Sequence, residues 1–216
     1  MSFLKLIYYG LLALCLITLL INRKKINSIY YWFIPLIGFG VITQVIGDIV
    51  NYSLAAENKQ TFMFHFYQPI EYMLLALFYW RLLEGKIVKK IVLISIPLFI
   101  SFCIYYYSTN IKSYLGPDFT NFTLEAILIT GLVAIFFLQL FKSEEYLNLT
   151  TYPAFWINTG NLFFYGGNLF VMGLHYYLAK QDSKLAEEFL SINHYLNLLL
   201  YMLYIIAFVC SKTNRK

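Results

Sequence analysis

Seven long blocks of apolar residues run along this chain of 216 residues and leave only short connections between them. Each block has about 20 residues, the number that an α-helix needs to cross about 30 Å of hydrocarbon. We expect membrane-spanning helices over 3–22, 29–54, 62–83, 88–107, 120–141, 153–178 and 188–211. The sequence therefore predicts an all-α fold, a polytopic integral membrane protein in which residues 1–216 form a single seven-helix transmembrane bundle.

The composition agrees with a membrane as the solvent, because 60% of the residues are hydrophobic and only 12% are charged. The net charge of +5 is spread along the chain and forms no single basic face, so we expect no nucleic-acid partner. Cys15, Cys103 and Cys210 each fall in a different apolar block, which favours inert buried thiols over a disulfide framework.

The orientation follows from the basic residues, because lysine and arginine collect in cytoplasmic connections. One side of the predicted bundle holds eleven of the sixteen basic residues, namely Arg23, Lys24, Lys25, Arg81, Lys86, Lys89, Lys90, Lys142, Lys212, Arg215 and Lys216. The other side holds Lys5, Lys59, Lys112, Lys180 and Lys184. We therefore expect an outer N-terminus and a cytoplasmic C-terminus, and the Ile-, Lys-, Asn- and Tyr-rich composition favours a multi-pass protein of a bacterial inner membrane.

Six ionisable side chains lie inside the predicted spans, where each costs about 2.5–3.5 kcal/mol to insert. They are Asp48, His65, Glu71, Glu125, His175 and His194. With the orientation above all six fall in the outer half of the bilayer, with Glu71 about 14 Å below the outer boundary at 1.5 Å per residue. This common depth predicts a polar pocket that opens to the outside.

Helical periodicity adds amides to the same faces, because residues three, four and seven apart share one side of a helix. The predicted ligand-binding residues are Asp48, His65, Gln68, Glu71, Glu125, Asn168, His175, His194 and Asn197. Segments 3–22 and 88–107 have no comparable stripe, so we expect them at the periphery of the bundle. Tyr105, Tyr106 and Tyr107 are typical of an interfacial aromatic belt.

Several functions suit such a pocket. A sensory or receptor-like protein would bind a small ligand or ion in it. An intramembrane hydrolase would use the carboxylates and histidines, with His65, His175 and His194 as candidate metal ligands, although the sequence has no HExxH or GxSxG motif. A small-solute or ion transporter would use the same carboxylates, but no internal repeat is detectable. A buried network that only holds the helices together is the remaining interpretation. No cofactor is indicated, and an enzyme is the less favoured reading.

The chain resembles uncharacterised seven-helix membrane proteins of AT-rich bacteria. The resemblance rests on the run from Tyr152 to Gly160 that leads to Tyr165, on Glu71-Tyr72, and on Asn193-His194 with Asn197. Similar bundles precede histidine kinases as membrane sensory modules. The resemblance thus implies a sensory role, and because this chain stops where a kinase linker would begin, it also implies a separate cytoplasmic signalling partner.

Overall fold

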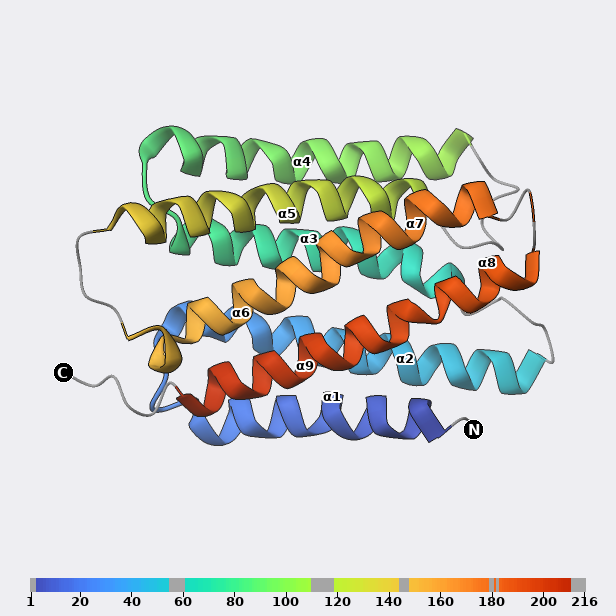
Figure 1. The fold of residues 1–216 in the computed structure, drawn as a ribbon, viewed down its shortest axis with the longest axis horizontal. Coiled ribbons are helices and arrows are strands. Elements are labelled where there is room, and N and C mark those ends of the chain that lie inside the picture. Colours follow the sequence, from blue (N-terminus) through green and yellow to red (C-terminus); the bar gives the residue numbers. More distant parts are fainter. Residues whose placement is uncertain are drawn as a thin grey trace. The chain divides into compact units, whose positions relative to one another are not determined.

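The computed structural model describes residues 3–54, 61–109, 119–143, 148–178, 181 and 183–210 (Figure 1), and these residues form helices and short turns without a strand. The basic residues Lys59, Lys112, Lys180, Lys212, Arg215 and Lys216, used above for the orientation, lie outside the described residues. Each apolar block of the sequence is largely helical over its described part. The fold class is therefore all-α.

Five helical stretches are long and apolar enough to cross a bilayer, namely Leu4–Asn22, Ser28–Val50, Lys86–Thr109, Thr120–Lys142 and Glu188–Cys210. The chain is therefore a multi-pass membrane protein. Two further helical stretches, Thr61–Leu82 and Pro153–Leu178, are not in that set. Their amide and ionisable side chains, such as Gln68 and Glu71 in the first and Asn158, Asn161 and Asn168 in the second, lower their mean hydropathy.

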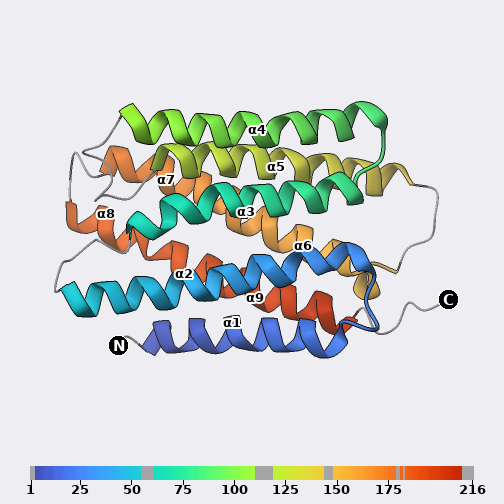
Figure 2. The same ribbon diagram turned by 180° about the vertical axis from the view of Figure 1, so that it is seen from behind.

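Residues Ile29–Glu125 form one compact unit. It contains the 3-10 turn Ser28–Trp32 from its second residue, α2 (Phe33–Leu54), α3 (Thr61–Leu82), α4 (Lys86–Thr109) and the start of α5 (Phe119–Lys142). The helix α3 packs against both α2 and α4 (Figure 2). Its buried face includes Phe78, whose ring lies 5.0 Å from that of Phe33. Aromatic side chains at helical spacing thus make α3 the central helix of this unit.

A tight connection joins α3 to α4 in that unit. The backbone of Gly85 has a φ of +92°, in the left-handed region that side chains with a Cβ rarely adopt. The Gly85 carbonyl then accepts the N–H of Lys89 at 3.1 Å, which starts the next helix. The left-handed backbone at Gly85 allows the sharp turn after which α4 runs antiparallel to α3.

Residues Met1–Ser28 and Ala126–Lys216 form the other unit. It contains α1 (Phe3–Asn22), the rest of α5, the 3-10 turn Leu149–Thr151, α6 (Pro153–Asn161), the π turn Leu162–Gly166, α7 (Gly167–Leu178), α8 (Ser183–Leu190) and α9 (Ile192–Cys210). The helix α9 packs against both α1 and α6. Figure 1 shows α6 and α7 as one continuous rod.

Two glycines bring that rod close to α9. A Cβ built on Gly160 would lie 3.3 Å from Leu200 Cδ1, and one built on Gly167 would lie 2.9 Å from Leu196 Cδ1. Both positions therefore face α9, although the π turn Leu162–Gly166 lies between them. Small residues at such positions allow close backbone approach, which is the main source of helix association within a bilayer.

The structure departs from the predicted segments at two points. The predicted helix over 153–178 contains the π turn Leu162–Gly166, where the N–H of Gly167 is shared between the carbonyls of Phe163 and Phe164. The predicted helix over 188–211 is interrupted at Ser191, whose Oγ donates to the Glu188 carbonyl at 2.6 Å. Adjacent glycines weaken α-helical geometry in the first case, and a serine side chain competes for backbone hydrogen bonds in the second.

Candidate functional site

The nine predicted ligand-binding residues divide between the two units. The unit Ile29–Glu125 contains Asp48 on α2, His65, Gln68 and Glu71 on α3, and Glu125 on α5. The other unit contains Asn168 and His175 on α7, and His194 and Asn197 on α9. The residues predicted for a single pocket therefore form two sets, one in each unit.

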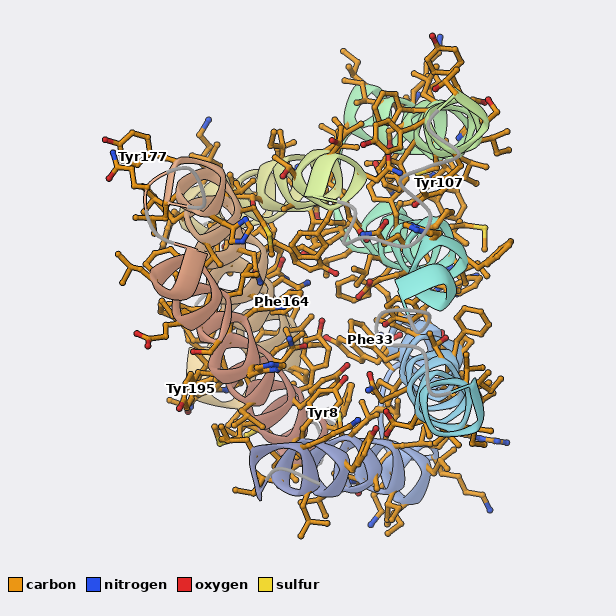
Figure 3. The ribbon with its side chains drawn as sticks, turned by 90° about the vertical axis from the view of Figure 1, so that its right-hand side faces the viewer. Tyr8, Phe33, Tyr107, Phe164, Tyr177 and Tyr195 are labelled. Carbon is orange, nitrogen blue, oxygen red and sulfur yellow. The ribbon has the colours of Figure 1, made fainter. Side chains whose placement is uncertain are left out.

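The first polar contact in the unit Ile29–Glu125 joins α3 to α4. The Tyr107 hydroxyl donates to Gln68 Oε1 at 3.2 Å, and the Tyr107 ring lies 4.6 Å from the ring of His65. Figure 3 shows Tyr107 between the two helices. His65 and Gln68 are both buried, and they lie three residues apart on one face of α3. A single tyrosine of α4 thus contacts both predicted site residues.

A second polar contact lies one turn further along α3. The Tyr72 hydroxyl donates to Ser95 Oγ at 2.7 Å, and the Ser95 hydroxyl donates in turn to the Val92 carbonyl at 2.8 Å. The Tyr72 ring packs 4.5 Å from Phe99, and its side chain is 1% exposed. Both hydroxyl protons are therefore engaged in this short chain of hydrogen bonds.

The carboxylates of Glu71 and Glu125 form the charged part of the same cluster. They are close enough to interact electrostatically, and Glu125 also interacts with Tyr72. Glu125 is fully buried, and neither of its carboxylate oxygens has a hydrogen-bond partner among the described residues. Asn121, one turn before Glu125 on α5, is also fully buried. We call His65, Gln68, Glu71, Tyr72 and Glu125 the α3–α5 cluster.

Asp48, the remaining predicted residue of this unit, is half-buried on α2. It lies one residue after Gly47, which is buried.

The other unit has a row of asparagines along α6 and α7. Asn158 and Asn168 donate their side-chain N–H groups to the carbonyls four residues earlier, those of Ala154 and Phe164, each at 2.8 Å. The Phe164 carbonyl belongs to the π turn, and the Phe164 ring is buried (Figure 3). The remaining oxygen of Asn168 is buried and has no hydrogen-bond partner in the described part of the chain.

A hydrogen bond between side chains of α6 and α9 involves a third asparagine. The Tyr204 hydroxyl donates to Asn161 Oδ1 at 2.5 Å, and both residues are buried. The ring of Tyr204 contacts that of Tyr201, which in turn meets Tyr8 of α1 at 5.7 Å. This row therefore links α1, α9 and α6 in the manner of an interhelical polar network.

The predicted residues near the ends of these helices are less enclosed. Asn197 donates within its own helix, to the Asn193 carbonyl at 3.0 Å and to Asn193 Oδ1 at 3.1 Å. His175 is half-buried, and His194 is exposed. His194 is therefore open to the surroundings of its helix, and Asn197 bonds only within its own helix among the contacts described.

The three histidines predicted as metal ligands belong to different units. His65 lies in one unit, whereas His175 and His194 lie in the other. No group of three His, Cys, Asp or Glu side chains in the described ranges is placed to hold a metal ion.

Sequence reasoning missed the contribution of α4. It found no polar stripe on segment 88–107 and assigned Tyr107 to an interfacial belt, so it did not predict that Tyr107 and Ser95 both bond to α3. Ser95 is one of two serines within an otherwise apolar and aromatic stretch, Ile91–Tyr107, and that isolation is the signal that could have identified it. Tyr107 carries no such signal because it ends a run of three tyrosines.

Comparison with protein-family models, with curated proteins and with solved structures finds no match to this chain.

Proposed function

We propose that this chain is a receptor-like sensory protein of a bacterial inner membrane that binds a small ligand at the α3–α5 cluster. In this proposal it has seven spans, an outer N-terminus and a cytoplasmic C-terminus. Five helices that are long and apolar enough to span the membrane support the proposal. The two more polar helical stretches would be the remaining spans, and one of them, α3, contains most of the cluster.

The observation that carries the proposal is the state of Glu125. A carboxylate that is fully buried without a hydrogen-bond partner costs several kcal/mol if it is ionised and uncompensated. Ionisable groups kept inside a membrane at such cost commonly mark ligand or ion sites. Glu71 and Tyr72 interact electrostatically with Glu125, and in this proposal a cationic or hydrogen-bond-donating ligand completes the site.

The α3–α4 hairpin supplies a route for a signal in this proposal. Gln68 and Tyr72 of the cluster lie on α3 and bond to Tyr107 and Ser95 of α4. The connection around Gly85 joins the two helices. That connection is flanked by exposed basic side chains, Arg81 and Lys86. A shift of α3 against α4 on ligand binding would move this basic end, where a separate cytoplasmic partner would bind.

Thermal unfolding of the purified protein with a panel of alkali-metal salts, primary amines and neutral amides tests the proposal. A ligand at 100 times its Kd stabilises the folded state by about 2.7 kcal/mol. We expect at least one compound to raise the Tm of the wild type and to lose this effect in Glu125→Gln.

The matched control is Thr130→Val, which removes another side-chain oxygen of α5 that is buried without a hydrogen-bond partner among the described residues. It should keep the ligand-dependent shift. Equal shifts in the wild type and in Glu125→Gln for every active compound would contradict a ligand site at the cluster.

A further inference from the structure

We propose that the turn between α3 and α4 binds the headgroup of an anionic phospholipid through Arg81, Lys86 and Lys90. None of these residues belongs to the α3–α5 cluster, so the inference goes beyond the ligand site proposed above and does not depend on it. Its partner is the lipid beside α4.

The stretch around this turn is strongly basic. Residues 81–90 contain Arg81, Lys86, Lys89 and Lys90, and Glu84 is the single acidic residue among them. One carboxylate can offset only one of the four positive charges. The first turn of α4 has no acidic residue either. Charge complementarity therefore favours an anion as the partner of this end of the hairpin.

Exposed apolar side chains on α4 indicate which anion lies beside the lysines. Ile87, Ile91, Ile94 and Leu98 are all exposed, and their spacing of four, three and four residues places them on one face. In a helix that is long and apolar enough to span a membrane, an exposed apolar face of this kind meets lipid. The face begins at Ile87, which is 77% exposed and directly follows Lys86.

The position of the lysines beside this face places them at the level of the lipid headgroups. Lys86 and Lys90 are both exposed, and they lie four residues apart on one side of the first turns of α4. Long basic side chains at the end of a span extend toward the membrane surface, where lipid phosphates lie. Hydrocarbon at Ile87 and phosphate at the neighbouring lysines are parts of one phospholipid molecule, which favours a lipid over a free anion or a protein.

Arg81 adds a donor whose orientation is set by the protein. Its guanidinium lies over the Trp32 ring, 5.3 Å from the ring centre, and the side chain is exposed. Contact through the face of the guanidinium leaves the N–H groups of its edge for an acceptor, and this planar edge matches two oxygens of one phosphate. The turn at Gly85 brings the chain from Arg81 to Lys86 within five residues, so both side chains lie at the same end of the hairpin.

Native mass spectrometry of the full chain tests the inference. The protein is released from non-ionic detergent micelles that contain phosphatidylglycerol and phosphatidylcholine with the same acyl chains. We expect the wild type to retain phosphatidylglycerol in preference to phosphatidylcholine. The double variant Lys86→Gln/Lys90→Gln should weaken the binding of phosphatidylglycerol by about tenfold or more, because each basic side chain near an anionic lipid surface contributes roughly a fivefold factor.

Two control variants accompany this experiment. Lys24→Gln/Lys25→Gln removes the same charge from two exposed positions after α1 and should leave the preference for phosphatidylglycerol intact. Lys86→Arg/Lys90→Arg keeps the charge at the proposed site and should retain the lipid.

Three outcomes would overturn the inference. Equal retention of the two lipids by the wild type would leave this basic end to a protein partner. Equal losses in the two glutamine double variants would mean that net charge alone attracts the lipid. Displacement of phosphatidylglycerol by an equal concentration of inorganic phosphate would identify a free-anion site. None of these measurements uses the Tm shifts that test the ligand site, so the two proposals fail separately.

Discussion

At the scale of single residues, the Tyr107 hydroxyl offers a direct test of the α3–α4 contact. Tyr107→Phe removes the donor to Gln68 but keeps the ring beside His65. Interhelical hydrogen bonds in membrane proteins contribute about 0.6 kcal/mol, and leaving Gln68 buried without this donor adds to the cost. We expect the free energy of unfolding to fall by about 0.6–1 kcal/mol, measured by denaturation of the purified protein in mixed detergent micelles.

The neighbouring Tyr105→Phe is the matched control, because Tyr105 is 66% exposed. It removes the same atom from the same helix and should leave stability unchanged. Equal effects of the two substitutions would show that the Tyr107 hydroxyl does not stabilise the hairpin.

These tyrosines also show where residue-level prediction from the sequence ends. The sequence predicted Gln68, Glu71 and Glu125 as site residues because polar side chains in apolar blocks are conspicuous. Tyr105 and Tyr107 belong to one aromatic run, yet one is exposed and the other bonds to α3. An apolar helix contains no polar pattern that says which face meets a neighbour, so only the packing of α4 on α3 separates them.

At the scale of helices, the contact of α6 with α9 depends on the absence of a side chain at Gly160. A Cβ there would lie 3.3 Å from Leu200 Cδ1, 3.4 Å from Leu203 Cβ and 3.6 Å from the Leu200 carbonyl oxygen. A leucine at this position must push the two helices apart, and overpacking of this kind costs about 1–3 kcal/mol. We expect Gly160→Leu to lower the free energy of unfolding by about that amount in the same denaturation assay.

Gly173 on α7 gives the control for that substitution, because nothing lies within 4 Å of a Cβ built there. Gly173→Leu should be neutral or slightly stabilising, since leucine has the higher helix propensity. A loss of stability as large as that of Gly160→Leu would mean that glycine acts at both positions through the backbone alone.

The helices also show how far periodicity predicts an element. Length and hydropathy located the helical blocks, because a bilayer requires about 20 apolar residues per span. They did not predict the π turn Leu162–Gly166 or the break at Ser191. Both depend on local backbone hydrogen bonds, and apolar residues continue through each interruption, so the hydropathy pattern does not change there.

At the scale of the whole molecule, the sequence predicted the class of protein better than it predicted the site. An all-helical membrane protein followed from the apolar blocks alone. The nine site residues were grouped by a common depth, which uses position along each helix but contains no information on which helices are neighbours. Glu71 and Glu125 belong to one unit and interact electrostatically, whereas His194 is an exposed residue on α9 of the other unit.

The number of spans and their orientation depend on the two polar helical stretches, Thr61–Leu82 and Pro153–Leu178. The side of the membrane on which the connections after these stretches lie tests both. If α3 crosses the bilayer, Glu84 is cytoplasmic; if the α6–α7 rod crosses, Gln181 is outside. In a chain whose three native cysteines are replaced by alanine, we expect a membrane-impermeant maleimide to label Gln181→Cys in cells whose outer membrane has been opened. Glu84→Cys should react only after the inner membrane is permeabilised. Labelling of Glu84→Cys from outside would show that α3 does not span or that the orientation is reversed, and protection of Gln181→Cys while Glu84→Cys stays cytoplasmic would show that α6 and α7 do not span. Because the charged pair of the α3–α5 cluster includes Glu71, a failure of α3 to span would also remove that cluster from the interior of the bilayer.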